Sequence, residues 1–354
     1  MVELVEQALA AARVAEENGD WDEYETILRQ AATDGAGALS FGLELVGSDD
    51  QAERATGCDL LYHASDQDET VRAEAAEALT ALAEREADDG VLWSLARAVE
   101  RTYDPRAVPV LVALAGHPDA DVRQRVAVSF VGVLTGLPDG PDVCALITLT
   151  RDECPQVRDW ATFTLGFQAE VDTREVRSAL WERTTDADPD TRAEGIRGLA
   201  RRHDPRAVPL LRDLLEDPEG ADVLTFSAAR ILGSSELLSA LRNYDPDDTG
   251  VTEAVHACDP VHRARQDALA WELVCELHRI RPDLRAGVSM ARFDAGLSIG
   301  VDTGFGPSDY CLEALLSRAD GDPVHAAELV AADSDETRRP TSEPLMNMPG
   351  RKRR

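Results

Sequence analysis

One nine-residue phrase occurs twice in the chain, and it limits the possible folds more than any other feature. It reads Tyr-Asp-Pro-Arg-Ala-Val-Pro-Val-Leu at residues 103–111 and His-Asp-Pro-Arg-Ala-Val-Pro-Leu-Leu at residues 203–211. A phrase that recurs with its prolines in place marks an internal repeat, which indicates an array of like units. Asp104 and Asp204 suit the N-cap of a helix, and the proline after each suits its first turn. We therefore expect each copy to open a helix rather than to form a binding site.

The second helix of each expected unit can be aligned on one apolar position. The aligned residues are spaced 31 to 35 residues apart and are Val91, Val122, Val157, Thr191 and Val223. Positions four and eight residues further on are mostly apolar or small, which places all three positions on one face of a helix. The middle position is mostly small and lets a neighbouring helix pack closely. The pattern predicts helical hairpins stacked side by side.

These motifs carry a family resemblance. Asp-Pro-Arg-Ala-Val-Pro-x-Leu, followed by Asp-x-x-Val-Arg and an Ala-rich helix, resembles the HEAT-like repeats first associated with phycobilisome lyases. The resemblance rests on Asp104–Leu111, Asp204–Leu211 and the helix openings at Arg123, Arg158 and Arg192. It covers residues 89–233 well and residues 37–88 more weakly. It implies a mainly α fold, a right-handed α-solenoid. It says little about function, since this repeat group includes scaffolds, regulatory subunits, chromophore lyases and a few DNA glycosylases.

The sequence pattern divides the chain into four segments. Residues 1–36 predict a helical N-terminal cap, and residues 37–233 predict the solenoid of HEAT-like repeats. Residues 234–332 lose the repeat register and predict a small C-terminal α+β element, with helices at 261–279, 308–318 and 323–332. Alternating apolar residues around Asp294-Ala295-Gly296 predict a β-hairpin at about 286–301. Residues 333–354 are polar and expected to be disordered, and they end in a basic stretch.

The chain is strongly acidic, with a formal net charge of -31. Such a body repels phosphate backbones, which disfavours nucleic acid as a partner and favours a basic or neutral protein. A halophile-like role in solvation would explain the same charge. Six scattered cysteines, no signal peptide and no long apolar run predict a cytoplasmic protein with reduced thiols and no membrane segment. The oligomeric state is left open.

The candidate binding residues lie on the second helices, which line the concave face of a helical solenoid. Four of them take the position three residues after the aligned residue, and the fifth follows on the same helix as the tryptophan; they are Arg125, Trp160, Glu194, Phe226 and Phe163. A Trp at such a position is a typical interaction hot spot, and in a DNA glycosylase it would stack on a flipped base. Packing in the core is the structural alternative for the aromatic residues.

Two further sets of residues have ordinary structural explanations. An arginine series resembles an anion-binding ladder, but each member follows an acidic residue by two to five positions, so ion pairs at the turns explain it; it comprises Arg72, Arg123, Arg158 and Arg192. A set with metal-binding atoms matches no zinc module in its spacing; it comprises His256, Cys258, His262, Cys275 and His278. No metal, cofactor or catalytic residue is therefore expected.

These observations favour a non-enzymatic scaffold or regulatory module that binds a protein on its concave face. Two alternatives stay open. One is an immunity- or antitoxin-type binder of a basic protein, for which the acidity is suited. The other is an enzyme on the same scaffold, either a lyase or a DNA glycosylase.

Overall fold

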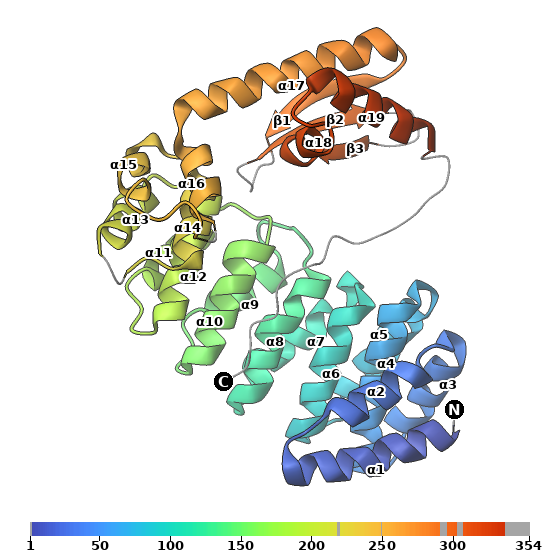
Figure 1. Cartoon of the computed structure of the whole chain (residues 1–354). Coiled ribbons are helices and arrows are strands. Elements are labelled where there is room, and N and C mark those ends of the chain that lie inside the picture. Colours follow the sequence, from blue (N-terminus) through green and yellow to red (C-terminus); the bar gives the residue numbers. More distant parts are fainter. Residues whose placement is uncertain (1, 218–219, 249, 291–295, 303–306, 337–354) are drawn as a thin grey trace. The chain divides into compact units, whose positions relative to one another are not determined.

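The computed structural model describes residues 2–217, 220–248, 250–290, 296–302 and 307–336. The chain forms two compact units, Met1–Leu232 and Gly233–Arg354. The first is an array of helical hairpins, and the second combines helices with a small sheet (Figure 1). The predicted mainly α solenoid and the small C-terminal α+β element are both present.

The first unit begins with two helices that pack on each other and on the first hairpin, α1 (Val2–Asn18) and α2 (Asp22–Ala31). The first helices of the hairpins, called here the outer layer, are α3 (Gly35–Val46), α5 (Arg72–Ala83), α7 (Val108–Leu114), α9 (Pro141–Leu149), α11 (Arg174–Arg183) and α13 (Ala207–Glu216). The second helices, called the inner layer, are α4 (Gln51–Gln67), α6 (Asp89–Thr102), α8 (Ala120–Val133), α10 (Pro155–Phe163), α12 (Pro189–Arg201) and α14 (Val223–Leu232). A π-helical turn, η3 (Thr164–Gln168), extends α10.

The inner layer is the more closely packed of the two. Each inner helix lies along the next, whereas the outer helices meet more sparsely. Glycines permit the approach: Gly132 of α8 lies against the backbone of Glu100 in α6, and Gly166 of η3 lies against Gly198 of α12. Closer spacing on one side curves a stack of helices toward that side, so the inner layer lines the concave face.

Both copies of the repeated phrase form the same turn. Asp104 and Asp204 accept hydrogen bonds from the backbone N–H groups of Arg106 and Arg206 at 3.0 and 3.1 Å. Each guanidinium also bonds back to the same carboxylate. The residue before each aspartate, Tyr103 or His203, adopts a left-handed φ of 49° or 48°. The phrase leads into the outer helices α7 and α13, which confirms its predicted role as a helix opening.

Ion pairs fasten each hairpin to its neighbour. Arg123 of α8 donates to Asp152 at 2.7 Å, and Arg158 of α10 donates to Asp186 at 2.8 Å. The same guanidinium groups also bond to carbonyls of their own loops. The structure thus pairs these two members of the arginine series with acids of the next hairpin, while Arg192 donates to a backbone carbonyl. Arg72 does so too.

The described elements of the second unit are η4 (Ser235–Leu237), α15 (Leu238–Leu241), α16 (Val251–Cys258), α17 (Pro260–Ile280), β1 (Arg285–Met290), β2 (Leu297–Asp302), β3 (Pro307–Cys311), α18 (Leu312–Arg318) and α19 (Pro323–Glu336). The strands form an antiparallel sheet in the order β1-β2-β3, with Val288 opposite Ile299 and Ile299 opposite Tyr310. Ile299 and Val301 are buried against Leu273 and Leu277 of α17.

Two predictions for this unit need correction, and one lies partly outside the described residues. The hairpin of β1 and β2 is confirmed, although Asp294 and Ala295 of its predicted turn are outside the described ranges. Residues 308–311 were predicted to be helical, but they pair with β2 as strand β3, and helix α18 begins at Leu312. The predicted disorder from residue 333 is wrong for residues 333–336, which continue α19. Residues 337–354 lie outside the description.

Candidate binding face

Three aromatic side chains of the inner layer gather where α10 passes into η3. The rings of Trp160 and Phe163 meet edge to face at 5.8 Å, and those of Phe163 and Phe167 stack at 6.0 Å with an interplanar angle of 21°. All three side chains are partly exposed. The core row of the same helices, represented by Val157, Ala161 and Leu165, is fully buried. The aromatic side chains therefore reach the surface of the inner layer, whereas the core row does not.

Two guanidinium groups from α12 lie against these rings; Arg201 is partly exposed, whereas Arg197 is buried with 6% exposure. Arg197 lies 3.7 Å from the centre of the Phe167 ring and 5.7 Å from that of Phe163, and Arg201 lies 4.9 Å from that of Phe167. A guanidinium at such a distance is attracted by the negative face of the ring, and the contact orders both partners. These five residues, Trp160, Phe163, Phe167, Arg197 and Arg201, are called here the aromatic cluster.

The structure brings together three of the five residues predicted from the sequence. Trp160 and Phe163 are in contact, and Glu194 joins them through an ion pair of 3.5 Å to Arg197. Arg125 instead lies over the ring of Trp93 at 4.5 Å and 3.9 Å from Glu100 of α6. Phe226 is buried in α14 with 6% exposure, and Glu194 is buried in α12 with 1% exposure. For Phe226, the packing alternative describes the position better than the binding prediction does.

The sequence alignment had not identified Arg197, Arg201 or Trp93 as part of this surface. The signal was nevertheless present, because Phe163 and Arg197 both lie six residues after the aligned position of their helix. Phe167 and Arg201 likewise lie ten residues after it. These two further rows place Phe163, Phe167, Arg197 and Arg201 on one side of their helices, whereas Trp93 lies in neither row.

The buried side chain of Arg202 stabilises the turn that carries part of the aromatic cluster. Arg202, 3% exposed, donates to the carbonyl oxygens of Leu165, Gly166, Ala169 and Val171 at 2.7 to 3.1 Å. The carbonyls at the end of a helix have no partner within the helix, and Arg202 satisfies them where η3 ends. Burial lowers the pKa of Arg202 to about 9. This side chain fixes the turn on which Phe167 is presented.

A polar network joins the N-terminal helix α2 to the inner helices α4 and α6. Glu25 of α2 lies 2.9 Å from His63 and 2.7 Å from Arg97, and Arg97 also donates to the buried Asp59 at 3.1 Å. Tyr24 donates to Asp59 at 2.9 Å. Burial opposes ionisation of Glu25, but the hydrogen bonds of His63 and Arg97 outweigh it and lower its pKa to about 2. The network fastens the N-terminal cap to α4 and α6.

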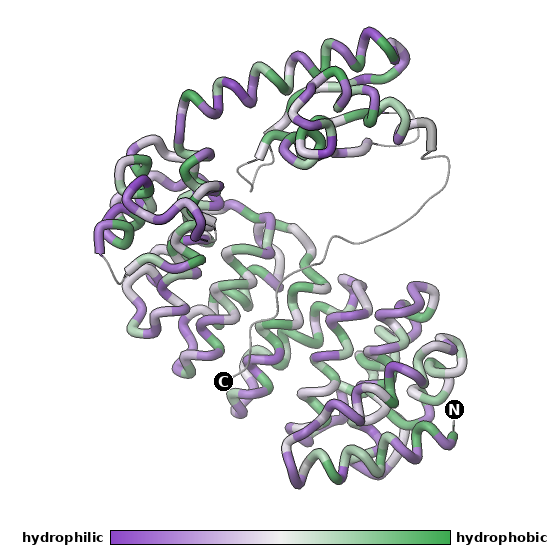
Figure 2. The backbone as a smooth tube through the Cα atoms, in the orientation of Figure 1, coloured by the Kyte–Doolittle hydropathy of each residue, from purple (hydrophilic) through white to green (hydrophobic). Residues whose placement is uncertain are grey.

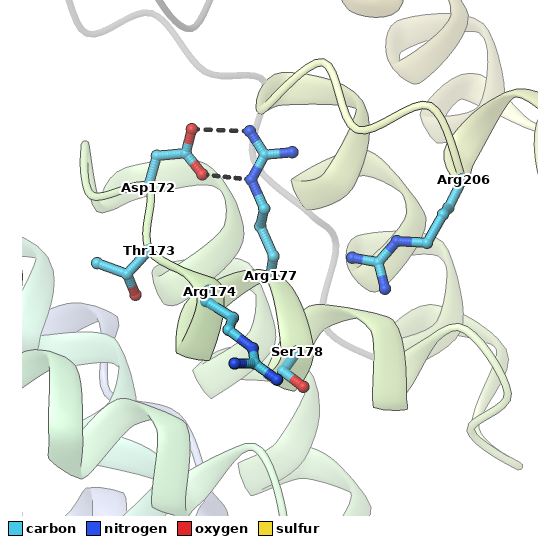
Figure 3. A pocket seen from close by; sticks show the side chains of 6 residues that line it. All are labelled: Asp172, Thr173, Arg174, Arg177, Ser178 and Arg206. Atoms are coloured by element: carbon cyan, nitrogen blue, oxygen red, sulfur yellow. Dashed lines mark hydrogen bonds and ion pairs between the residues drawn. The ribbon is translucent and has the colours of Figure 1, made fainter.

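A pocket of about 490 Å³ lies beside the start of α11 (Figure 3), lined by Asp172, Thr173, Arg174, Arg177, Ser178 and Arg206. Arg177 donates to Asp172 at 2.6 and 2.8 Å and to Asp204 at 3.2 Å. Arg206 bonds to Asp204 as well, and these bonds hold the pKa of Asp204 at about 2 although its side chain is buried. Arg177 and Arg206 are thus paired with carboxylates of the chain itself, and the pocket is part of the ion-pair network between hairpins.

The residues with metal-binding atoms do not converge. The rings of His256 and His262 stack at 4.1 Å, while Cys275 is exposed further along α17 and His278 accepts a hydrogen bond from the N–H of Ala286. In the ranges that the structure describes, no three His, Cys, Asp or Glu side chains are arranged to hold a metal ion. Within the same ranges, no helix is both long enough and apolar enough to cross a membrane.

Comparisons with known proteins agree with this architecture. Residues 143–233 match the family model of HEAT repeats. The X-ray structure of YibA from Escherichia coli is 21% identical with a TM-score of 0.52, and the match covers 72% of this chain and 95% of that one. The complex of CpcE and CpcF of phycocyanin lyase from Nostoc is 18% identical with a TM-score of 0.42, covering 62% and 86%. No curated protein matches the chain. The family match identifies residues 143–233 as HEAT repeats, and the likeness to YibA supports the same helical repeat fold over most of the chain.

Proposed function

We propose that the chain is a protein-binding module whose concave face, centred on the aromatic cluster, receives a segment of a partner protein. The partly exposed stack of Trp160, Phe163 and Phe167 carries this proposal. Tryptophan and arginine dominate the energetic centres of protein interfaces because they combine a large apolar area with directed polar groups. Rings that guanidinium groups already hold in place lose little side-chain freedom when a partner covers them.

The charge of the chain indicates the kind of partner. The net charge of -31 attracts basic surfaces and repels acidic ones over the range of the ionic atmosphere. We infer a basic or neutral protein as the partner. Glu194, the carboxylate that a base-excision enzyme would need in this groove, is 1% exposed and paired with Arg197. That observation gives no support to the glycosylase alternative.

Truncating one ring tests the proposal. Full-length wild type, Trp160→Ala and Trp181→Ala are used to capture proteins from a native lysate, and the recovered protein is purified for calorimetry. Trp181 is the matched control, since it is 38% exposed but lies on the outer helix α11. We expect Trp160→Ala to weaken binding by about thirtyfold, the loss typical of a hot-spot residue, and Trp181→Ala to leave it unchanged. Equal affinity of wild type and Trp160→Ala would remove the aromatic cluster from the function.

A further inference from the structure

Aromatic rings of the inner layer are covered by guanidinium groups from the next hairpin. In each case the ring comes from one hairpin and the arginine from the hairpin that follows it. These contacts, called here the ring–guanidinium pairs, are Tyr62–Arg97, Trp93–Arg125 and Phe167–Arg197, with 4.2, 4.5 and 3.7 Å between the ring centre and the guanidinium carbon. A cation over the face of a ring is held by the negative charge of that face. Hydrophilic and hydrophobic positions are accordingly interspersed along the inner helices (Figure 2).

Trp160 departs from this pattern. Its side chain is partly exposed and meets Phe163 edge to face, but no guanidinium group of the residues that the structure describes lies over its ring. The sequence explains the difference. Trp160 lies three residues after the aligned position of α10, and the same position in the next inner helix, α12, is Glu194. A carboxylate is repelled by the face of an indole ring, and Glu194 is buried and paired with Arg197 instead.

The charges beside Trp160 favour a cation as the group that covers it. The arginines of the ring–guanidinium pairs before and after Trp160 in the sequence each lie near a carboxylate of the chain; these ion pairs are Arg125–Glu100 and Arg197–Glu194, at 3.9 and 3.5 Å. Their positive charge is thus offset within the chain. Asp159, the residue before Trp160, adds a partly exposed carboxylate, and the whole chain carries a net charge of -31. Both attract a cation and repel an anion.

We propose that the ring of Trp160 is a subsite for an arginine side chain of the partner protein, which supplies the guanidinium group that α12 does not. The proposal rests on the protein-binding function proposed above and names the group by which the partner is recognised. Arginine fits better than lysine, because its planar guanidinium stacks flat on an indole ring and still donates hydrogen bonds in its own plane. The ammonium group of lysine is a more strongly hydrated point charge.

Nuclear magnetic resonance of the indole N–H groups tests the subsite on the full chain. The five tryptophans give separate resonances, and that of Trp160 is identified by its loss in Trp160→Ala. The probes are N-acetyl-arginine methylamide, its neutral analogue N-acetyl-citrulline methylamide, and N-acetyl-lysine methylamide. We expect the arginine probe to shift the Trp160 resonance with an affinity about tenfold higher than that of the citrulline probe, the size of a cation–π contact, and higher than that of the lysine probe.

Two other tryptophans are internal controls in the same spectra. Trp181 is 38% exposed, but Arg206 already lies over its ring at 4.8 Å, so its resonance should not respond to the arginine probe. Trp271 is 57% exposed and represents a ring that water covers. It should bind the probe severalfold more weakly than Trp160, because a cation–π contact is stronger where the ring is partly withdrawn from water.

The outcomes separate this subsite from the protein-binding function. Equal affinities of the arginine and citrulline probes at Trp160, no response there, or a response no stronger than that of Trp271 would overturn the subsite. Lysine binding as tightly as arginine would overturn the choice of a guanidinium group. If one of these results is found while Trp160→Ala still weakens binding of the captured partner, the subsite alone fails. A partner affinity that Trp160→Ala leaves unchanged overturns the function and the subsite together.

Discussion

Replacing Gly132 by alanine would test the close packing that curves the inner layer. An added Cβ would lie 1.8 Å from the carbonyl oxygen of Glu100 and 2.6 Å from its carbonyl carbon, both in α6. Side-chain Cβ atoms essentially never approach other atoms within 3.0 Å. The obstacle is backbone, which cannot rotate aside as a flexible side chain can. The end of α8 and the end of α6 must therefore move apart.

Moving α6 and α8 apart lowers the free energy of unfolding by an amount that can be estimated. Forcing an extra carbon into a packed site costs about 1–3 kcal/mol, and a backbone obstacle places Gly132→Ala near the upper end of that range. Alanine also restricts the unfolded chain more than glycine does, which by itself raises the free energy of unfolding by about 0.5–1 kcal/mol. The expected net loss in the free energy of unfolding is about 2 kcal/mol, which lowers the melting temperature by about 4–8 °C for a unit of this size.

Thermal unfolding followed by circular dichroism measures the effect. Gly116→Ala provides the control, because a Cβ at Gly116 meets no atom within 4 Å, and we expect it to stay within about 0.5 kcal/mol of wild type. If Gly132→Ala melts at the same temperature as Gly116→Ala, then α6 and α8 are not packed as closely as described, and the explanation for the curvature fails.

Three further predictions follow from the polar groups of the first unit. Arg202→Met should lower the free energy of unfolding by about 3 kcal/mol or more, because it leaves the buried carbonyls of η3 without donors, and chemical denaturation measures this; a loss below about 1 kcal/mol would refute the role of Arg202. The pKa of Glu25 is lower in the folded chain than its ordinary value of 4.5, so its stabilisation is complete above about pH 5 and is lost as the pH falls toward 2. Glu25→Gln should therefore flatten the acid limb of the stability profile by about 1–2 kcal/mol, and an unchanged limb would contradict the assignment. His203→Gly should stabilise the chain by about 0.5–1 kcal/mol because its φ is left-handed, whereas His203→Val should destabilise it; thermal melts that order the two variants oppositely would exclude strain at this turn.

The repeat architecture was predictable because short local sequence patterns determine it. A helix opening needs an aspartate and a proline at fixed positions, and Asp104 and Pro105 supply them within two residues of sequence. A buried helical face needs apolar residues at fixed intervals, and Val157, Ala161 and Leu165 supply them at intervals of four. Strand β3 lacked such a signal. Residues 308–311 become a strand through pairing with β2, which is a tertiary effect that periodicity does not contain.

The candidate binding face was predictable only in part, for a related reason. Trp160 and Phe163 were found because aromatic residues are conspicuous on an aligned helix. Arg197 joins them by stacking on Phe163 and Phe167, which belong to the preceding hairpin more than twenty-five residues earlier. The partner of Arg125, Trp93, lies one hairpin before it. Contacts between hairpins depend on their relative rotation, and the alignment of single helices does not fix that rotation.

The ion pairs between hairpins have a consequence for how the first unit folds and opens. Arg54 with Glu86, Arg123 with Asp152 and Arg158 with Asp186 each join neighbouring hairpins and skip none. Order can therefore spread from any hairpin to the next without closing a long loop, so folding should be fast and should tolerate several starting points. Loss of one such pair should open one junction while distant hairpins stay closed. Hydrogen exchange would then rise in a short band of residues around that junction rather than across the whole unit.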